Sequence, residues 1–470
     1  MIHRVRPAVL SIAGHDPSGG AGLSADLKVF EAWGVQGQSV CTALTAQNSS
    51  TFQEPGWVSW PHIQKQIDIL FAERRIDFCK IGLVENADTL GRIVEHLREL
   101  NPAIFILWDP ILQASAGFDF HSHEQKFSFQ KICSQISLVT PNQPEAEWLG
   151  PDLPCSMLLK GGHQQGETCV DRLVWKGKTL AEFAQPRLDG LRKHGSGCVL
   201  SASITALLAK GLRLESAARL SRKMLQEYLQ GTPGLLGSVR DAVASIREEE
   251  LDGGDPRLYA ITWDQAGRSH EEQAEQLCAA GIHILQWRSK TGTPVERQRS
   301  AQNVLRICRQ WGCRLVVNDD VALAKAIGAP GVHLGLNDTP IPQAREILGP
   351  DVWIGGTANT PEQALQRIAD GADYIGLGPW RHTETKEKLS PILGTQGVEM
   401  ALDAIRKQHP HFPVYVIGGI EPLDCKEILE LGATGVAVSS ALVAAKDIPK
   451  SVQDFHQALA GIKNLVGDSL

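Results

Sequence analysis

Acidic and basic side chains follow short apolar runs in the second half of the chain, in a pattern suited to binding a diphosphate. Arg288 and Lys290 come directly after one apolar run, and Asp319 and Asp338 come after the next two. Two carboxylates can hold one Mg2+ with few protein ligands, which leaves coordination positions for phosphate oxygens. Cationic side chains stabilise a departing diphosphate. These residues therefore predict a magnesium-dependent diphosphate site.

Glycine-rich segments in the first half indicate a second phosphate site. Residues 13–22 follow the first strand-like run, and residues 194–198 open an apolar helix, 199–210. Neither segment has the spacing of a Gly-x-x-x-x-Gly-Lys-Ser/Thr phosphate loop or of the dinucleotide-binding Gly-x-Gly-x-x-Gly motif. Backbone amides at a helix start can hold a transferring phosphoryl group. This predicts an anion hole formed by Gly195, Ser196, Gly197 and Cys198.

Cys198 stands in the first turn of that apolar helix. The helix dipole is expected to lower the pKa of a thiol placed there, which would make the cysteine reactive. The alternative is that Cys198 is a small buried residue of the hydrophobic core. The residue pattern alone leaves both interpretations open.

Eight apolar runs with helical patterns between them must position the side chains of the second half. Eight βα units within residues 257–470 predict a (β/α)8 TIM barrel, whose chemistry takes place at the C-terminal ends of the strands. A doubly wound sheet would usually have fewer strands. The predicted strands are 258–262, 283–287, 314–318, 331–335, 352–357, 373–378, 414–419 and 435–440.

The ends of these predicted strands are polar or rich in glycine around most of the ring. Solvated loop charge would explain one such end, but chance rarely places so many on one face of a barrel. The glycines at 418–419 and the amides of Ser439 and Ser440 can hold a further phosphate before the last helices. The ring therefore predicts a diphosphate site beside a monophosphate site.

The first half alternates strands and helices in the same way, which predicts an α/β domain with a largely parallel sheet. This domain runs over residues 1–236. Residues 237–256 are charged and end in Gly-Gly-Asp-Pro, so they are interpreted as a helix, 240–250, within a linker to the barrel. The predicted strands of this domain are 9–14, 39–46, 78–83, 104–110, 138–142 and 157–162, with helices at 25–33 and 89–100.

The motifs of the barrel resemble those of thiamine-phosphate synthase. Gln-x-Arg-x-Lys, Asn-Asp, His-Leu-Gly-x-x-Asp, Thr-x-Thr-Lys and Ile-Gly-Gly-Ile occur in that family's order over residues 258–442. The resemblance implies that a pyrimidinylmethyl diphosphate loses diphosphate and that the nitrogen of a thiazole phosphate captures the resulting cation. It implies that Asp319 and Asp338 bind Mg2+. It implies that the pyrimidine diphosphate contacts Gln286, Arg288, Lys290, Asn318 and Lys386, and that Thr383, Thr385, Gly418, Gly419, Ser439 and Ser440 hold the thiazole phosphate.

The barrel departs from this family at a few positions. Leu336 and Asn337 replace the usual Gln-Glu before the second metal-binding Asp, and Thr357 keeps the hydroxyl of a strand-five Ser. Asn359 replaces a frequent His, and Trp287 replaces a smaller apolar residue. These changes put the tuning of the site in doubt but not its reaction.

The first half resembles hydroxymethylpyrimidine (phosphate) kinase, a member of the ribokinase-like superfamily. Seven motifs follow that family's order over residues 9–211. They are Ser-Ile-Ala-Gly-His-Asp-Pro-Ser-Gly-Gly-Ala-Gly (11–22), Thr-Ala-Leu-Thr-Ala-Gln-Asn (42–48), Lys-Ile-Gly (80–82), Asp-Pro (109–110), Thr-Pro-Asn-Gln-Pro-Glu-Ala-Glu (140–147), Lys-Gly-Gly-His (160–163) and His-Gly-Ser-Gly-Cys (194–198).

The kinase resemblance implies a role for each matching residue. Asp26 and Gln47 would recognise the aminopyrimidine, and Leu83 would line its pocket. Lys160 would neutralise the phosphates of ATP, while Asp109 and Glu145 would orient Mg2+ directly or through water. Cys198 would lie beside the acceptor oxygen, where sugar kinases of this fold carry an Asp base. Positioning and charge neutralisation would supply most of the catalysis.

Two departures leave other functions open for the first half. Only residues 148–156 stand where the family has a longer helical excursion, and residues 113–117 lack the usual Lys/Thr-Ser-Gly. The half could therefore be a pyrimidine-binding or regulatory module, with the barrel alone catalytic. A kinase for pyridoxal-type vitamins is a third possibility, which the fused barrel makes a weaker interpretation.

Composition limits the remaining possibilities. A formal charge of −7 gives no basic surface for nucleic acid, and no run of about 20 apolar residues is present to cross a membrane. The ten cysteines are irregularly spaced, which is typical of reduced thiols in a cytoplasmic protein. The expected partners are small molecules: the pyrimidine and its phosphates, thiazole phosphate, ATP and Mg2+. By family resemblance we also expect a homodimer.

Overall fold

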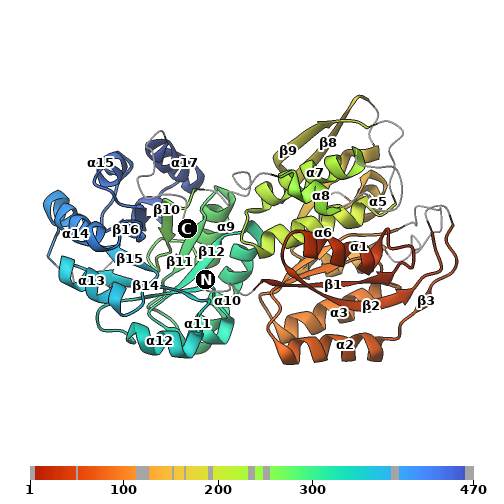
Figure 1. Ribbon diagram of the computed structural model, residues 1–470, viewed down its shortest axis with the longest axis horizontal. Helices are drawn as coiled ribbons and strands as arrows, with labels where there is room; N and C mark the ends of the chain where they lie inside the picture. Colours follow the sequence, from red (N-terminus) through yellow and green to blue (C-terminus); the bar gives the residue numbers. More distant parts are fainter. Residues whose placement is uncertain are drawn as a thin grey trace. The chain divides into compact units, whose positions relative to one another are not determined.

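The computed structural model describes residues 6–48, 51–112, 126–150, 153–163, 166–188, 194–230, 239–246, 255–382 and 391–460 (Figure 1). The chain divides into two compact units, one formed by Val5–Gly253 and the other mainly by Gly254–Leu470. No helix among the described residues is long and apolar enough to cross a membrane.

The first unit is the predicted α/β domain, and its sheet has nine strands among the described residues. The strand order is β3-β2-β1-β4-β5-β6-β7-β8-β9. The central strands are parallel, whereas β3, β8 and β9 are antiparallel to their neighbours. The strands are β1 (Ala8–His15), β2 (Gln36–Leu44), β3 (Gly56–Trp57), β4 (Phe78–Ile81), β5 (Phe105–Trp108), β6 (Leu138–Val139), β7 (Ser156–Leu159), β8 (Thr168–Trp175) and β9 (Lys178–Pro186).

The helices of this unit pack into two hydrophobic clusters, one with α1, α6, α7 and α8 and the other with α2 to α5. Their bounds are α1 (Gly22–Ala32), α2 (Trp60–Glu73), α3 (Ala87–Leu100), α4 (Lys126–Ile132), α5 (Gln143–Leu149), α6 (Ser196–Ala209), α7 (Leu214–Gln230) and α8 (Val239–Ala244).

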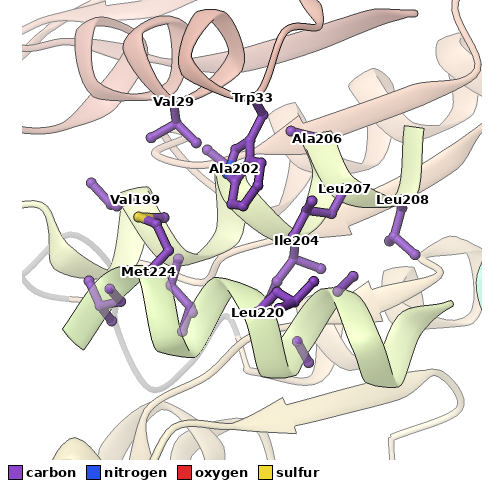
Figure 2. Close-up of a cluster of buried hydrophobic side chains, with 14 of the residues drawn as sticks. Val29, Trp33, Val199, Ala202, Ile204, Ala206, Leu207, Leu208, Leu220 and Met224 are labelled. Atoms are coloured by element: carbon purple, nitrogen blue, oxygen red, sulfur yellow. The ribbon is translucent and has the colours of Figure 1, made fainter. Parts of the chain in front are cut away.

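Helix α6 is buried on every side, which fixes where the second glycine-rich segment lies. Every residue from Cys198 to Leu208 is buried. An all-round apolar helix belongs inside a domain. Trp33 packs against α6, as Figure 2 shows, and its indole N–H donates a hydrogen bond of 2.7 Å to the hydroxyl of Ser203. The start of α6 is therefore held firmly at one edge of the sheet.

Helix α8 lies within the segment interpreted as a linker. Val239, Ala242 and Ile246 are buried in the cluster formed with α1, α6 and α7. These residues belong to the core of the first unit because their apolar side chains complete it. Residues 237–238 and 247–254 lie outside the described part of the chain, as do residues 113–117.

The second unit is a closed barrel of eight parallel strands, which confirms the predicted (β/α)8 fold (Figure 1). Every predicted strand is present. The strands are β10 (Leu258–Ile261), β11 (Ile284–Trp287), β12 (Arg314–Asn318), β13 (Gly331–Leu334), β14 (Trp353–Ala358), β15 (Tyr374–Leu377), β16 (Val414–Ile417) and β17 (Gly435–Val438). Its helices are α9 (His270–Ala279), α10 (Pro294–Trp311), α11 (Val321–Ile327), α12 (Ile341–Leu348), α13 (Pro361–Ala369), α14 (Gly394–Gln408), α15 (Cys425–Glu430), α16 (Ser440–Val443) and α17 (Ile448–Leu459).

Candidate active sites

Three of the residues predicted to act on phosphate and metal lie together in the first unit. Asp109 directly follows β5, Lys160 directly follows β7, and Glu145 stands in the first turn of α5. The Lys160 Nζ atom lies 2.9 Å from Asp109 Oδ1 and 3.8 Å from Glu145 Oε2. Parallel strands bring their C-terminal ends to one edge of the sheet, which is why residues 51 positions apart can meet there.

The charges of this cluster influence one another strongly. Burial raises the pKa of Glu145 to about 7, and only part of that effect is offset by Lys160. Burial would also raise the pKa of Asp109, but Lys160 and Lys80 more than compensate and lower it. The two carboxylates in turn raise the pKa of Lys160 against the effect of burial. The cluster therefore keeps a lysine cation beside an ionised aspartate.

The predicted anion hole lies directly against this cluster. A Cβ atom added at Gly197 would lie 3.5 Å from Lys160 Nζ and 3.6 Å from Asp109 Oδ2. Gly195 has a φ of +79°, and a Cβ atom there would lie 1.9 Å from the carbonyl oxygen of Gly20. The glycines thus allow the two glycine-rich segments to touch and let the lysine approach the start of α6.

A buried carboxylate that sequence reasoning did not single out organises the two glycine-rich segments. Asp16 is fully buried and accepts hydrogen bonds from the backbone N–H groups of Ser18, Gly20 and Ala21 at 2.7–3.1 Å. Its Oδ2 atom also lies 3.1 Å from His194 Nε2. The signal in the sequence was an acidic residue, Asp16, inside the first glycine-rich segment, together with His194 at the start of the second.

Cys198 does not have the lowered pKa expected from the helix dipole. Its side chain is buried, and burial raises the pKa of the thiol to about 11 even though Lys80 acts in the opposite direction. The expectation of an activated thiolate is wrong because the position in the helix was visible in the sequence while the depth of burial was not. Cys198 is a neutral thiol.

Asp26 is completely buried, so it lies beneath the surface of the predicted pocket rather than lining it. Its carboxylate is fully buried and lies 2.9 Å and 3.1 Å from Lys80 Nζ, and it accepts a 2.5 Å hydrogen bond from Ser11. Burial raises the pKa of Asp26 although Lys80 acts in the opposite direction, and the Asp26 carboxylate raises the pKa of Lys80 against the effect of burial. Sequence reasoning gave Lys80 no role, although a lysine inside an apolar strand was a signal.

Two other predicted pocket residues lie near the ends of β2 and β4. Leu83 is buried, its carbonyl accepts a 2.6 Å hydrogen bond from Thr42, and its side chain would lie 3.1 Å from a Cβ atom at Gly14. Gln47 is half-buried and forms an isolated bridge with Phe52. Both lie beyond the C-terminal ends of their strands, where ligands bind in open α/β sheets.

In the barrel, the predicted metal-binding carboxylates and one predicted cation lie together. Asp319 follows β12 and Asp338 follows β13, and each carboxyl group shifts the pKa of the other. Lys290 forms an ion pair with Asp319. Burial and the Asp319 charge raise the pKa of Asp338, whereas the hydrogen bond to Asp338 and the Lys290 charge lower that of Asp319 despite its burial.

The backbone at Asp319 is strained in a way that serves this site. Its φ is +64°, which is unusual for a residue other than glycine. The left-handed conformation costs about 1–2 kcal/mol, and such strain is found mainly where the surrounding structure requires it for function. Here it turns the chain sharply after β12, and the N–H of Asp319 donates a 2.8 Å hydrogen bond to the carbonyl of His333.

A chain of buried hydrogen bonds crosses the barrel interior and connects two predicted substrate residues, Gln286 and Thr357. Gln286 Nε2 donates to the Tyr259 hydroxyl at 2.9 Å, which lies 3.0 Å from that of Tyr374. His333 lies 3.1 Å from the Tyr374 hydroxyl and 2.9 Å from Thr357 Oγ1. Sequence reasoning missed the two tyrosines and His333, because only the strand register shows that they meet.

The loop that carries Arg288 and Lys290 is fixed from the strand before it. Asp264 accepts hydrogen bonds from the Lys290 N–H and from the Ser289 hydroxyl, both at 2.8 Å. The Arg288 N–H donates to Thr262 at 3.0 Å. The next strand along contributes Asn318, which is buried and in register with His333. These hydrogen bonds place Arg288 and Lys290 at the same rim of the barrel as the two carboxylates.

The predicted monophosphate site lies at the ends of two neighbouring strands. β16 and β17 pair in parallel, and Gly418 and Gly419 follow the first while Ser439 and Ser440 follow the second. Gly418 has a φ of +98° and would place a Cβ atom 2.6 Å from the side chain of Pro379. Thr383, Thr385 and Lys386 lie outside the described residues.

Comparison with known proteins covers both units. The family model for phosphomethylpyrimidine kinase matches residues 16–152 and 152–240, and that for thiamine monophosphate synthase matches residues 258–442. A chloroplastic thiamine biosynthetic bifunctional enzyme from Arabidopsis thaliana is 30% identical, over 96% of this chain and 93% of its own length. The chain belongs to this bifunctional family.

Other relatives match either the whole chain or the barrel alone. A probable chloroplastic bifunctional enzyme from Oryza sativa is 31% identical over 93% of this chain and 86% of its own length. A thiamine-phosphate synthase from Flavobacterium psychrophilum is 41% identical over 41% of this chain and 95% of its own length. The first unit is thus a phosphomethylpyrimidine kinase, and the barrel is a thiamine-phosphate synthase.

The departures of the synthase unit from its family have local structural explanations. Asn359 is buried and donates a hydrogen bond to the carbonyl of Gly378, so it supports the backbone between β14 and β15. Trp287 is buried at the end of β11, with its ring 5.8 Å from that of His270. Both residues lie beneath the rim and support the loops that carry the predicted ligands.

The raised pKa of Cys198 gives a test within the kinase unit. We expect Cys198→Ser to leave the pH dependence of the kinase kcat unchanged between about pH 6 and 9, because a thiol with a pKa of about 11 is already protonated there. The measurement is the rate of ADP formation across this range. Loss of an ionisation on the alkaline side in the variant would contradict a neutral Cys198.

Proposed function

We propose that the first unit phosphorylates 4-amino-5-hydroxymethyl-2-methylpyrimidine and its monophosphate with ATP, and that the barrel joins the resulting diphosphate to thiazole phosphate. The products would be thiamine phosphate and diphosphate. The observation that supports this most is that each unit gathers carboxylates and lysines at the C-terminal ends of its strands. Both clusters suit the transfer or release of phosphate groups rather than acid–base chemistry.

In the kinase unit, each residue of the cluster would act on charge. Lys160 would neutralise the phosphates of ATP, and the amides of Gly195, Ser196 and Gly197 would receive the transferring phosphoryl group. Asp109 and Glu145 offer carboxylate oxygens of the kind that Mg2+ requires, and a bound ion would neutralise charge on the phosphates. Cys198 would lie beside the acceptor oxygen as a neutral hydrogen-bonding thiol rather than as a base.

Recognition of the pyrimidine would use the residues around β1, β2 and β4. Gln47 and Leu83 would contact the ring directly, while Asp26 would act from beneath the pocket together with Lys80. The burial of Asp26 supports this division, because both of its oxygens already accept hydrogen bonds. Asp16 and His194 would hold the anion hole in position.

In the barrel, Asp319 and Asp338 would hold Mg2+, which would neutralise the departing diphosphate. The fit is supported by the mutual effect of the two carboxyl groups on their pKa values and by Lys290, whose ammonium group already provides a positive charge for Asp319. Arg288, Lys290 and Lys386 would bind the diphosphate oxygens. The side chains of Gln286, Asn318 and Thr357 would orient the pyrimidine, with Tyr259 fixing Gln286 and His333 fixing Thr357.

The monophosphate of the thiazole would lie at the ends of β15, β16 and β17. Gly418 and Gly419 would offer backbone amides, and Ser439, Ser440, Thr383 and Thr385 would offer hydroxyl groups. The thiazole phosphate would then lie across the rim from the metal-binding carboxylates, and the thiazole nitrogen would capture the pyrimidine cation after diphosphate departs. Positioning then supplies most of the rate enhancement.

A coupled assay tests both activities in one chain. Hydroxymethylpyrimidine, ATP, Mg2+ and thiazole phosphate are supplied, and thiamine phosphate is measured. We expect its formation to depend on ATP, and we expect the barrel to work without ATP when the pyrimidine diphosphate is supplied directly. Thiamine phosphate formed only from added diphosphate would favour the alternative in which the first unit is a regulatory module. Comparison with pyridoxal as acceptor tests the third possibility.

Asp319 is the residue of the barrel whose replacement tests the proposed metal site. We expect Asp319→Asn to lower kcat/KM of the synthase by about 10²–10³-fold, because it removes a charge that would bind Mg2+. Asn is preferred to Ala because it tolerates the positive φ at this position. The matched control is Asp351→Asn, at an exposed position before β14. Equal activity in both variants would refute the metal assignment.

The cellular setting follows from the same proposal. All ten cysteines are free thiols, as expected in a reducing compartment. We propose a cytoplasmic protein that forms a homodimer. Size-exclusion chromatography with light scattering would give the mass, and a value near that of one chain, 51.1 kDa, would rule out the dimer.

A further inference from the structure

Three buried cysteines lie together in the helical layer of the barrel, away from the strand ends used by the synthase. Cys278 is near the end of α9, Cys308 is near the end of α10, and Cys313 precedes β12. Their Sγ atoms all lie within 4.8 Å of one another. They are 0%, 0% and 6% exposed, and none of them forms a disulfide.

The local backbone brings these thiols together. Helix α10 ends at Gly312, which has a left-handed φ of +67°. The N–H of Cys313 then donates a 2.8 Å hydrogen bond to the carbonyl of Cys308. This bond is the signature of a Schellman turn, which reverses the chain over the last turn of a helix. Because α9 packs against α10, Cys278 completes the cluster.

We propose that Cys278, Cys308 and Cys313 bind one soft divalent metal ion of the Zn2+ class. Thiolate sulfur is a soft ligand that selects such ions. At a metal–sulfur distance of about 2.3 Å, sulfur atoms bound to one ion lie about 4 Å apart. Sulfur atoms already within 4.8 Å of one another need to move by less than about 1 Å to reach that arrangement.

Charge and burial define the form of the bound site. Burial and the two neighbouring thiols raise the pKa of Cys308. Metal binding must therefore release protons to solvent, and its affinity increases with pH. The thiolate rather than the thiol is the ligand, so each cysteine that coordinates the ion gives up its proton.

The location assigns the site a structural rather than a catalytic role. Cys278 lies just before β11, and Cys313 lies immediately before β12, whereas the synthase residues lie at the opposite ends of these strands. In TIM barrels the catalytic residues lie at the C-terminal face, whereas the N-terminal face contributes to stability. An ion bound only by the folded state stabilises it by mass action. We therefore expect the metal to tie α9, α10 and the start of β12 together.

The test uses the full chain, reduced and treated with a chelator that is then removed. Excess Mg2+ is added to occupy oxygen-ligand sites, and Cd2+ is titrated as a probe while sulfur-to-metal charge-transfer absorption is followed in the ultraviolet. We expect one equivalent of Cd2+ per chain, displaced by Zn2+. At a free metal concentration of about 100 times Kd, the Tm of the barrel should rise by about 5–10 °C.

Variants separate this cluster from other thiols. We expect Cys308→Ser to weaken Cd2+ binding by more than about 100-fold, because loss of a ligand exceeds the effect of losing a supporting hydrogen bond. Cys425→Ser is the matched control, since Cys425 is an equally buried barrel cysteine in α15 outside the cluster. Should Cys308→Ser fail to fold, Cys313→Ser removes the most exposed of the three thiols.

Three results would overturn the proposal. The first is charge-transfer absorption and affinity that are the same in the cluster variants as in the Cys425→Ser control. The second is the absence of stoichiometric Cd2+ binding by the folded protein. The third is a disulfide within the cluster in the freshly purified protein that persists under the assay conditions and excludes Cd2+, which would make the cluster a redox pair.

Discussion

Replacing Lys160 with alanine is expected to lower the kinase rate by about 10³-fold or more while leaving the synthase rate unchanged. The ammonium group lies between Asp109 and Glu145 and against the start of α6, where the transferring phosphoryl group would be bound. Charge stabilisation of a transferring phosphoryl group is worth about 10³–10⁵-fold when a single cation supplies it. The measurement is ATP consumption that depends on hydroxymethylpyrimidine.

The synthase activity of the same chain serves as an internal control for the Lys160 experiment. The synthase is assayed in the same preparation with pyrimidine diphosphate supplied, so that a folding defect of the whole chain would be detected as a loss of both. Lys178→Ala, at an exposed position at the start of β9, is the matched control in the kinase unit. An undiminished kinase rate in Lys160→Ala would remove Lys160 from the proposed mechanism.

Lys160→Arg distinguishes charge from shape at the same position. Arginine keeps the positive charge but replaces the compact ammonium group with a planar guanidinium group on a longer side chain. The space beside Gly197 is narrow, since a Cβ atom there would already lie 3.5 Å from Lys160 Nζ. We therefore expect arginine to recover only a small part of the lost rate.

The sequence was sufficient to predict the barrel because strand-like and helix-like patterns alternate at regular intervals along it. Each apolar run is followed by polar residues and then by a helical pattern, and all eight predicted strands overlap the observed ones. Closure of the barrel then brings the strand ends together without further information. This is why Lys290, Asp319 and Asp338 could be predicted as neighbours although up to 48 residues separate them.

The β8–β9 hairpin of the kinase unit was not predicted. Its two-residue turn is Lys176-Gly177, with φ values of +47° and +74°. Such turns usually carry Asn-Gly or Asp-Gly, because both central residues need a positive φ. Because lysine is unusual in the first position, the turn was not recognised in the sequence. The strands on each side of it were therefore not recognised as a hairpin.

The parts of the site that were missed depend on register and burial. The hydrogen bonds from Gln286 through Tyr259 and Tyr374 require that three strands place these side chains inward at matching heights. The pKa of Cys198 depends on how completely the core covers the start of α6. Neither the hydrogen-bond chain nor the pKa of Cys198 can be predicted from the local sequence, because both depend on residues that are distant along the chain.

Replacing Lys80 with methionine is expected to destabilise the kinase unit by about 3–5 kcal/mol. Lys80 and Asp26 are both 0% exposed, and their charges are separated by 2.9 Å. Removing one member of a buried ion pair leaves the other charge without compensation in a medium of low dielectric constant, which costs about this much. Methionine nearly preserves the volume of lysine, so the loss reflects charge more than a cavity. Calorimetry of the full chain would measure it, with the barrel transition as internal control.

A double-mutant cycle decides whether the pair itself is the cause. Removing both charges, as in Lys80→Met with Asp26→Leu, is expected to restore most of the stability lost in either single variant, because replacing a buried pair by apolar residues is often neutral or better. The hydroxyl of Ser11 would lose its acceptor, so recovery should be incomplete. Kinase activity should nevertheless stay low in the double variant if the pair positions the pyrimidine. Additive losses in the double variant would show that the two residues contribute independently.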